Sequence, residues 1–256
     1  TESYDGIGNE EFKNLLKSEN VRKRKNASLN IEVPCDTLRS LLLAEPQDLF
    51  GSLSVKFKGE EALDLGGVAR EFFTLVSNKI FSPDYGMFEQ HENFYWFVRD
   101  DGNDMERYFT LLGAFIGIAN NNNVILPIRF PNILYKKLMN FNDSVFSLHD
   151  LGEIEPKVAG SLANLLKMKD DGRDVDDIGL MFELSVDFFR SQQVIELIRD
   201  GSNIPVTNDN VEKYVELFID WKLNKSINNR FVPFKEGYDM ICSTPIMKIF
   251  APEELS

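Results

Sequence analysis

The sequence predicts a mainly helical α+β fold, and three kinds of stretch support that prediction. Between residues 53 and 58 apolar and polar side chains alternate, which is typical of a strand with one buried face. In residues 105–119, 208–224 and 226–241 apolar side chains recur at helical spacing. The chain has 256 residues, of which 43% are hydrophobic, so it can bury a core in one large or two modest domains.

The first 50 residues are predicted to hold two helices and a short strand. Residues 9–25 have the composition of a polar helix that ends in a basic cluster at 21–25. We interpret this cluster as a solvated face and not as a nucleic-acid site, because the remainder of the chain is acidic. A short strand is expected at 31–33. Asp36 can cap a second helix, and Pro46 marks its end.

A strand, a glycine turn and a helix are predicted in succession between residues 53 and 80. Gly66 and Gly67 lie where the apolar period changes from two residues to about 3.6. Because glycine has no Cβ, we expect a positive φ at this corner. A phosphate-binding loop would need GxxxxGK[ST] or GxGxxG here, and LGGVARE matches neither pattern. The corner is therefore predicted to be structural.

The middle of the chain is predicted to contain a buried strand and then a central helix. The strand covers Phe94–Phe97, and the acids in the turn after it lack the spacing of an EF-hand, so we predict no metal site. The helix covers residues 105–119, and its glycines Gly113 and Gly117 permit another helix to approach closely. A short helix is expected around 135–139.

Residues 146–205 differ in their sequence pattern from the preceding part of the chain, and we interpret them as a small inserted subdomain. It is predicted to contain a helix at 156–167, an acidic loop at 169–177 and a strand at 179–184. In the helix that follows, at 208–224, the apolar positions spread over about 240° of the helix circumference. A helix with one neighbour needs a narrower stripe, so this helix is predicted to touch two surfaces.

Composition excludes several classes of function. With 41 acidic against 28 basic side chains and a net charge of −13, the chain does not suit nucleic acid, and a basic protein partner fits it better. No apolar run reaches the ~18 residues of a membrane span. Cys35 and Cys242 have neither zinc nor disulfide spacing, which indicates a reducing compartment, the cytoplasm with the nucleus as a second location. His91 and His149 lie in polar stretches and are not predicted to be catalytic.

Five stretches of the sequence, in order, resemble segments of the HECT-type ubiquitin ligases. They are EEALDLGGVAREFF at 60–73, IFSPDYGMF at 80–88, IPVTNDNVEKYVELF at 204–218, LNKSINNRF at 223–231 and IFAPEEL at 249–255. The similarity is greatest to the branch of the founding member. It implies the N-terminal lobe of the catalytic domain, with a larger helical subdomain (1–145 and 206–256) and a smaller α/β subdomain (146–205) that binds the ubiquitin-conjugating enzyme. The corner residues of the family motif are Asp64, Gly66, Gly67 and Glu71.

The resemblance implies a function in ubiquitin transfer. The lobe recruits a conjugating enzyme charged with ubiquitin, and ubiquitin then passes to a cysteine of a C-terminal lobe and on to a substrate lysine. That cysteine lies in a Thr-Cys-x-Asn-like setting in the family, which VPCDT around Cys35 and ICSTP around Cys242 do not match. We therefore expect no catalytic residue and no C-terminal lobe in this chain, no cofactor, no thioester formation by the chain alone, and substrates bound by regions outside it.

The resemblance also places a groove for an aromatic side chain of the conjugating enzyme. Matched by segment, the groove positions are Val158, Leu162, Leu165, Met168, Ile178, Leu180, Tyr214 and Phe218. The alternative from the residues alone is that all eight belong to the core, because exposed apolar patches are exceptional. The adjacent acidic loop is either a steering surface for a basic partner or merely solvated. For the whole chain, the alternative function is that of a non-catalytic interaction module with this fold.

Overall fold

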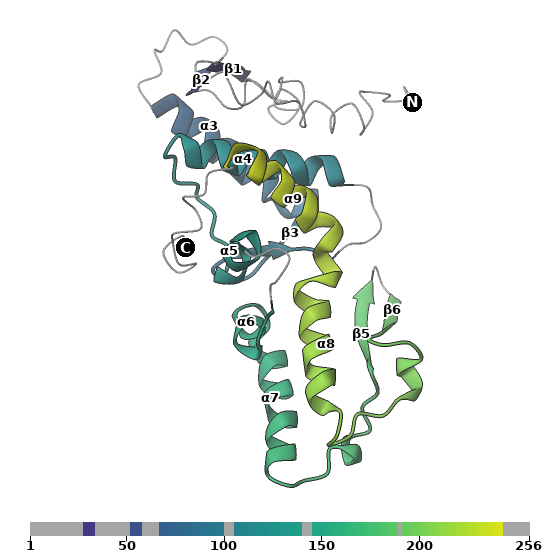
Figure 1. Cartoon of the computed structure of the whole chain (residues 1–256). Coiled ribbons are helices and arrows are strands. Elements are labelled where there is room, and N and C mark those ends of the chain that lie inside the picture. Colours follow the sequence, from purple (N-terminus) through teal and green to yellow (C-terminus); the bar gives the residue numbers. More distant parts are fainter. Residues whose placement is uncertain are drawn as a thin grey trace, which may run out of the picture. The chain divides into compact units, whose positions relative to one another are not determined.

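The computed structural model describes residues 28–33, 52–57, 67–99, 105–139, 145–188 and 191–242, and Figure 1 labels most of its helices and strands. Within these residues the protein is mainly helical and has three two-stranded pairings. The predicted α+β class is therefore confirmed. None of the described helices combines the length and the apolar composition that a membrane span requires.

The chain divides into two compact units. The first consists of the described residues within Thr1–Met87, Asp104–Ile128 and Arg230–Pro245, and the second of those within Phe88–Asn103 and Arg129–Asn229. The predicted boundary between residues 205 and 206 falls inside the second unit. The division into a larger lobe and a partner-binding subdomain remains a prediction.

The first unit contains a parallel strand pair and three long helices. Its elements are β1 (Ser28–Val33), β2 (Ser52–Phe57), α3 (Gly67–Ile80), η3 (Pro83–Tyr85), α4 (Glu106–Asn121) and, from Arg230 onward, α9 (Asn228–Ile241). The strands predicted at 31–33 and 53–57 are both present, and Ile31 lies opposite Val55 in the ladder. The helices predicted at 9–25 and after Asp36 lie outside the described residues.

Aromatic side chains from α3 and α4 form part of the core of the first unit. Phe72 and Phe73 are each 1% exposed, and the ring of Phe73 lies 5.0 Å from that of Phe115 on α4. The Phe72 and Phe73 rings meet edge to face at 5.4 Å, an arrangement that aromatic quadrupoles favour. Most positions of the faces predicted from helical spacing in residues 68–80 and 105–119 are buried, but Leu75 and Tyr108, which were assigned to those faces, are 50% and 45% exposed.

Helices α4 and α9 touch backbone to backbone. A Cβ at Gly113 would lie 1.9 Å from the carbonyl oxygen of Phe234, and one at Gly237 would lie 1.8 Å from that of Thr110. Packed interiors have no room for such an overlap, so only glycine fits at either position. A Cβ at Gly117 would also be close, 2.7 Å from the Cβ of Ile241. The close helix approach predicted at Gly113 and Gly117 is confirmed, and its partner is α9.

The expectation of a positive φ at Gly67 is wrong. Gly67 is the exposed first residue of α3, it is absent from the positive-φ glycines of the described residues, and a Cβ there would meet nothing within 4 Å. A helical conformation at an open position needs no glycine. Glu71 is exposed in the same helix, whereas Asp64 and Gly66 lie outside the described residues.

The second unit contains two antiparallel hairpins and the helices α5 to α8. Its elements are β3 (Phe88–Gln90), β4 (Tyr95–Phe97), α5 (Asn132–Met139), α6 (Leu148–Ile154), α7 (Pro156–Asp170), η4 (Asp176–Ile178), β5 (Glu183–Phe188), β6 (Ser191–Glu196), η5 (Gly201–Asn203), α8 (Val211–Leu223) and η6 (Lys225–Ile227). The predicted strand at 94–97 and the helices around 135–139, 156–167 and 208–224 are present.

Several elements of the second unit differ from the sequence-based expectation, and the strands β3 and β6 were not predicted. The strand expected at 179–184 begins later, at Glu183, because Gly179 has a φ of 70° and closes the turn after η4. The helix α6 was not predicted. Its N-cap is Ser147, whose hydroxyl accepts from the backbone N–H of Asp150 while the Asp150 carboxylate accepts from the Ser147 N–H, which is a capping box.

Candidate functional site

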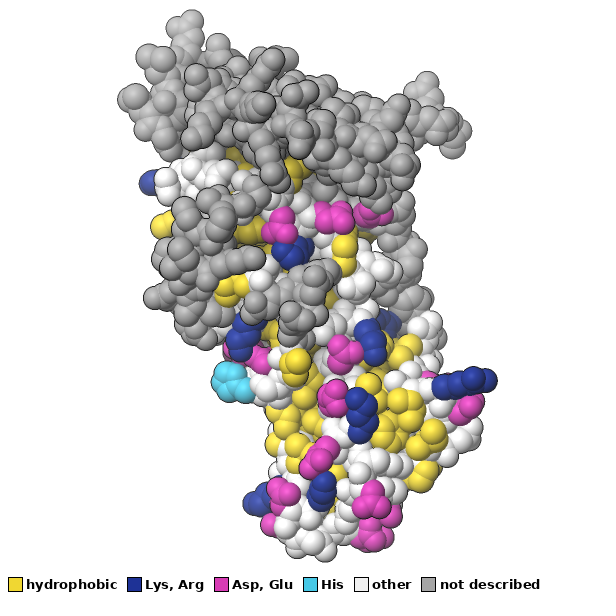
Figure 2. All heavy atoms as spheres, in the orientation of Figure 1, with side chains coloured by type: hydrophobic (Ala, Val, Ile, Leu, Met, Phe, Trp, Pro, Cys, Tyr) yellow, Lys and Arg dark blue, Asp and Glu magenta, His cyan; other side chains and the backbone are white. Residues whose placement is uncertain are grey.

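The eight predicted groove residues all lie in the second unit. They come from α7, from the connection between α7 and β5, and from α8. Figure 2 shows hydrophobic side chains gathered over the part of the molecule that these elements and the β5–β6 hairpin occupy. Leu162, Leu165 and Tyr214 are buried. The remaining five are partly or largely exposed, namely Val158, Met168, Ile178, Leu180 and Phe218.

Helix α7 supplies one side of this framework. Pro156 stands at its first position, where proline's fixed φ suits a helix start and its missing N–H is no loss. Leu162 and Leu165 are 4% and 8% exposed, and Val158, one turn before Leu162 on the same face, is only half-buried. The face predicted from the i, i+4, i+7 spacing is therefore buried in its middle and open toward its start.

Helix α8 supplies the second side. The Tyr214 ring is buried and meets Phe182 edge to face at 5.6 Å, while the ring of Phe218, one turn later, lies 6.0 Å from Tyr214. Helix α8 also packs on α6 and α7, which confirms that it touches more than one surface. Burial, together with the negative charge of Glu183, raises the pKa of Tyr214, so its phenol is neutral at physiological pH.

The connection between α7 and β5 is fixed by hydrogen bonds and one buried side chain. Val175 is fully buried, its N–H donates to the side-chain oxygen of Asn208 at 3.0 Å, and the Asn208 amide donates to the carbonyl of Arg173 at 3.1 Å. Further along, the N–H of Val206 donates to the carbonyl of Leu180 at 2.8 Å. These bonds hold the segment that carries Ile178 and Leu180 to the chain just before α8.

The acidic loop predicted at 169–177 is exposed. Its carboxylates belong to Asp170, Asp171, Asp174, Asp176 and Asp177, all of them exposed. Lost hydration and the neighbouring charges of Asp174, Asp177 and Asp209 raise the pKa of Asp176. Arg173 pairs with Asp171 at 3.1 Å. The loop thus presents mutually repelling negative charge beside the half-exposed apolar residues.

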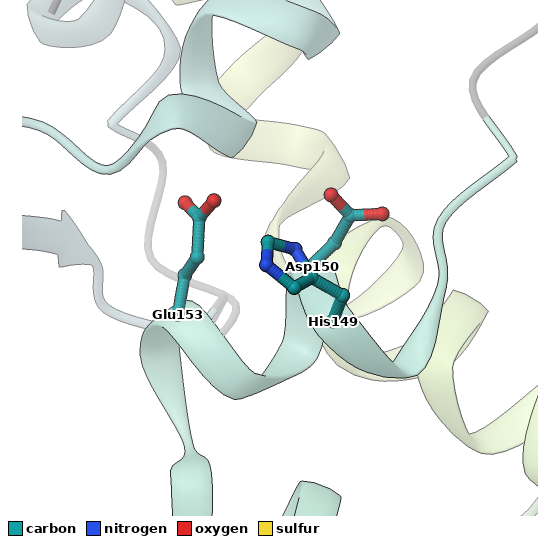
Figure 3. A group of neighbouring side chains, drawn as sticks. All are labelled: His149, Asp150 and Glu153. Carbon is teal, nitrogen blue, oxygen red and sulfur yellow. The ribbon is translucent and has the colours of Figure 1, made fainter. Parts of the chain in front are cut away.

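A second group of side chains in this unit escaped the sequence-based prediction because α6 itself did. His149, Asp150 and Glu153 on that helix have ligand atoms within 4.8 Å of one another. Figure 3 shows the three side chains as sticks. Asp150 is buried and accepts from Lys136 and from the N–H and hydroxyl of Ser147, the latter two at 2.8 Å. Glu153 accepts from the N–H of Ile133 at 3.3 Å. These carboxylates already have donors, and the group joins α5 to α6.

The described cysteine does not have the environment of a nucleophile. Cys242 in the first unit is buried, and its Sγ lies 3.6 Å from the carbonyl oxygen of Gly117. Burial, which outweighs hydrogen bonds from Asn120 and Tyr238, raises the pKa of the Cys242 thiol. A nucleophilic cysteine needs the opposite shift, since the thiolate is the reactive form. Cys35 lies outside the described residues.

Residues 74–256 match the model of the HECT-domain (ubiquitin-transferase) family. The chain is 34% identical over 223 residues to "Probable E3 ubiquitin-protein ligase HERC4" of Homo sapiens, an alignment that covers 86% of this chain and 20% of the relative. It is 34% identical over 221 residues to "Probable E3 ubiquitin-protein ligase HECTD2" of Mus musculus, covering 81% of this chain and 28% of the relative.

A fungal relative gives a similar result. The chain is 30% identical over 213 residues to "Probable E3 ubiquitin-protein ligase mug30" of Schizosaccharomyces pombe, which covers 82% of this chain and 26% of the relative. The chain thus spans between 20% and 28% of the length of the three relatives.

Proposed function

Since the chain belongs to the HECT-domain (ubiquitin-transferase) family, we propose that it recruits a ubiquitin-conjugating enzyme charged with ubiquitin. The observation that carries this proposal is a set of partly exposed apolar side chains in the second unit, where hydrogen bonds hold the segment between α7 and β5 to the chain before α8. The set consists of Val158, Met168, Ile178, Leu180 and Phe218. An aromatic anchor of a partner, buried against such a set, supplies much of the binding energy of an interface.

The proposed reaction passes ubiquitin along a series of acyl acceptors. A thiolate of a C-terminal lobe attacks the thioester carbonyl of the charged conjugating enzyme, a new thioester forms, and the enzyme's thiolate leaves. A substrate lysine amine then attacks that thioester to form an amide, and the lobe's thiolate is released. In this scheme the chain positions the conjugating enzyme and contributes no reacting group. Ubiquitin and the substrates are further partners, and the site of action is the cytoplasm or nucleus.

The chain alone is expected not to accept ubiquitin as a thioester. The raised pKa of Cys242 and its burial leave little thiolate at neutral pH. The chain is incubated with activating enzyme, conjugating enzyme, ATP and ubiquitin and run on a non-reducing gel, where the adduct of the conjugating enzyme is the positive control. A reductant-sensitive adduct on this chain that disappears in Cys242→Ser or Cys35→Ser contradicts the prediction that the chain holds no catalytic cysteine.

The exposed acidic loop is expected to speed the association of a conjugating enzyme with a basic face. Rim charges act mainly on the association rate and its salt dependence. Changing Asp174, Asp176 and Asp177 to Asn should therefore slow association several-fold at low salt and leave dissociation nearly unchanged. Stopped-flow kinetics at two ionic strengths measure this. An association rate that responds neither to salt nor to the three substitutions means that the loop is merely solvated.

Transfer assays on the full-length protein separate the ligase from a non-catalytic interaction module. A module binds the conjugating enzyme, or another protein, through the same apolar residues but passes no ubiquitin onward when the full-length protein is tested. Transfer from the conjugating enzyme to the full-length protein, followed by modification of a substrate lysine, supports the ligase.

A further inference from the structure

A buried lysine joins α5 to the C-terminal end of α8. Lys137 is 4% exposed, and its Nζ donates a hydrogen bond to the side-chain oxygen of Asn224, the residue that caps α8. The Asn224 amide in turn donates to Asp220 at 2.8 Å, and Lys225 pairs with the other oxygen of Asp220 at 3.0 Å. The Lys137 Nζ also lies 5.2 Å above the Phe146 ring.

The burial of this amine places its titration near physiological pH. Desolvation lowers the pKa of Lys137 to about 8, and the negative charge of Asp220 only partly opposes that shift. Burial raises the pKa of Asp220, but hydrogen bonds from Asn224 and Lys225 and the nearby positive charges outweigh burial and lower it. Asp220 therefore stays ionised throughout the range in which Lys137 titrates.

Two other lysines, one on α5 and one on α8, form ion pairs of their own. Lys136, the neighbour of Lys137, pairs with Asp150 on α6. The pKa of Asp150 is lowered, because hydrogen bonds from Lys136 and Ser147 outweigh the effect of burial. On α8, Lys222 pairs with Glu155 at 2.8 Å. Asp150 thus stays ionised in the weakly alkaline range in which Lys137 titrates.

We propose that Lys137 is a proton-controlled latch between α5 and the C-terminal end of α8, closed most firmly when the amine is neutral and opened more readily when it takes up a proton. A neutral amine still donates to Asn224 but no longer carries the cost of a buried charge. In the open state the side chain reaches water and regains its ordinary affinity for a proton. Proton uptake therefore shifts the equilibrium toward opening.

The direction and range of the pH dependence follow from linkage. The pKa is about 8 in the closed state and about 10.4 for a solvated lysine. Between these values the open state binds one proton more, so the opening equilibrium constant falls by up to about tenfold for each pH unit gained. Below pH 8 both states are protonated, and this group contributes no further change.

Hydrogen exchange of the backbone amides in α5 and in residues 220–228 tests the latch between pH 7.5 and 9.5. After correction for the intrinsic exchange rate, protection in the parent should rise by about tenfold or more over this range. In Lys137→Met that rise should vanish. Lys213→Met is the matched control, because Lys213 lies on α8, the helix that Asn224 caps, and its side chain is 56% exposed. This variant should behave as the parent.

A rise in protection that persists in Lys137→Met, or its absence from the parent, overturns the latch. A second measurement does not depend on the folding of any variant. In the parent labelled with ¹³C at lysine Cε, one lysine signal should titrate with a midpoint near 8, well below the solvated lysines. If all lysine signals titrate near 10.4, the proposal is wrong.

Discussion

The substitution Gly113→Ala is expected to lower the free energy of unfolding by about 3 kcal/mol or more. The added Cβ would lie 1.9 Å from the carbonyl oxygen of Phe234 and 2.7 Å from the amide nitrogen of Tyr238. Both are backbone atoms of α9 and cannot move aside as the end of a side chain can. Relief requires α4 and α9 to separate, which opens the core between them. Urea unfolding followed by circular dichroism measures the change.

Gly160→Ala is the matched control for this prediction. Gly160 also lies inside a helix, α7, but it is exposed and a Cβ there would meet nothing within 4 Å. Alanine is the better helix former, so this variant should be more stable than the parent by roughly 0.5–1 kcal/mol. A Gly113→Ala variant that also gains stability would show that α4 and α9 are not in backbone contact.

The glycines of α4 show what periodicity can and cannot predict. The spacing of apolar residues predicts the helix, and two glycines on it predict a close neighbour. The neighbour's identity depends on a pairing across more than a hundred residues, Thr110 with Gly237, which no local pattern records. The same limit explains β1 and β2. Alternation predicts both strands but says nothing about their parallel pairing.

The errors have local causes. A helix as short as α6 shows little periodicity, although its capping box, Ser147 with Asp150, was present in the sequence and could have indicated its start. At Gly67 a glycine pair was taken to require a positive φ, whereas the first turn of a helix tolerates glycine without needing it. At 179–184 the left-handed conformation of Gly179 forms a turn, so the strand begins later than predicted. The apolar residues of this stretch did not indicate that turn.

For the candidate site the sequence could not separate core from surface. The spacing of Val158, Leu162 and Leu165 identifies one face of a helix, but burial depends on which elements cover that face. In the structure Leu162, Leu165 and Tyr214 are buried, whereas Ile178 is 44% exposed. The family resemblance supplied the choice of residues. Whether they bind a conjugating enzyme remains a prediction.

Because Leu162 is buried, its truncation is expected to act on stability. Leu162→Ala should lower the free energy of unfolding by about 2–5 kcal/mol, as for other buried leucines. A loss of binding in that variant would not distinguish a contact from a damaged framework. The half-exposed Phe218 and Ile178 are better probes, because partners can reach them at a smaller cost to folding.

Phe218→Ala and Ile178→Ser are each expected to weaken the binding of a conjugating enzyme by about tenfold or more, which corresponds to about 1.4 kcal/mol. The reason is the loss of apolar surface against which a partner's aromatic side chain is buried. Titration calorimetry measures the affinity for a conjugating enzyme chosen from a purified panel by its binding to the parent chain, and thermal melting verifies that each variant is folded.

Ile125→Ser is the matched control, because it makes the same replacement at an isoleucine that is 90% exposed and lies in the other unit. It should bind as the parent does. If folded Phe218→Ala and Ile178→Ser variants also keep the parent's affinity, or if no enzyme of the panel binds, these residues do not form the recruiting surface. An equal loss in all three variants would indicate a nonspecific effect of reduced surface hydrophobicity. A loss confined to Phe218 and Ile178 assigns recruitment to the surface formed by α7, α8 and the segment between α7 and β5.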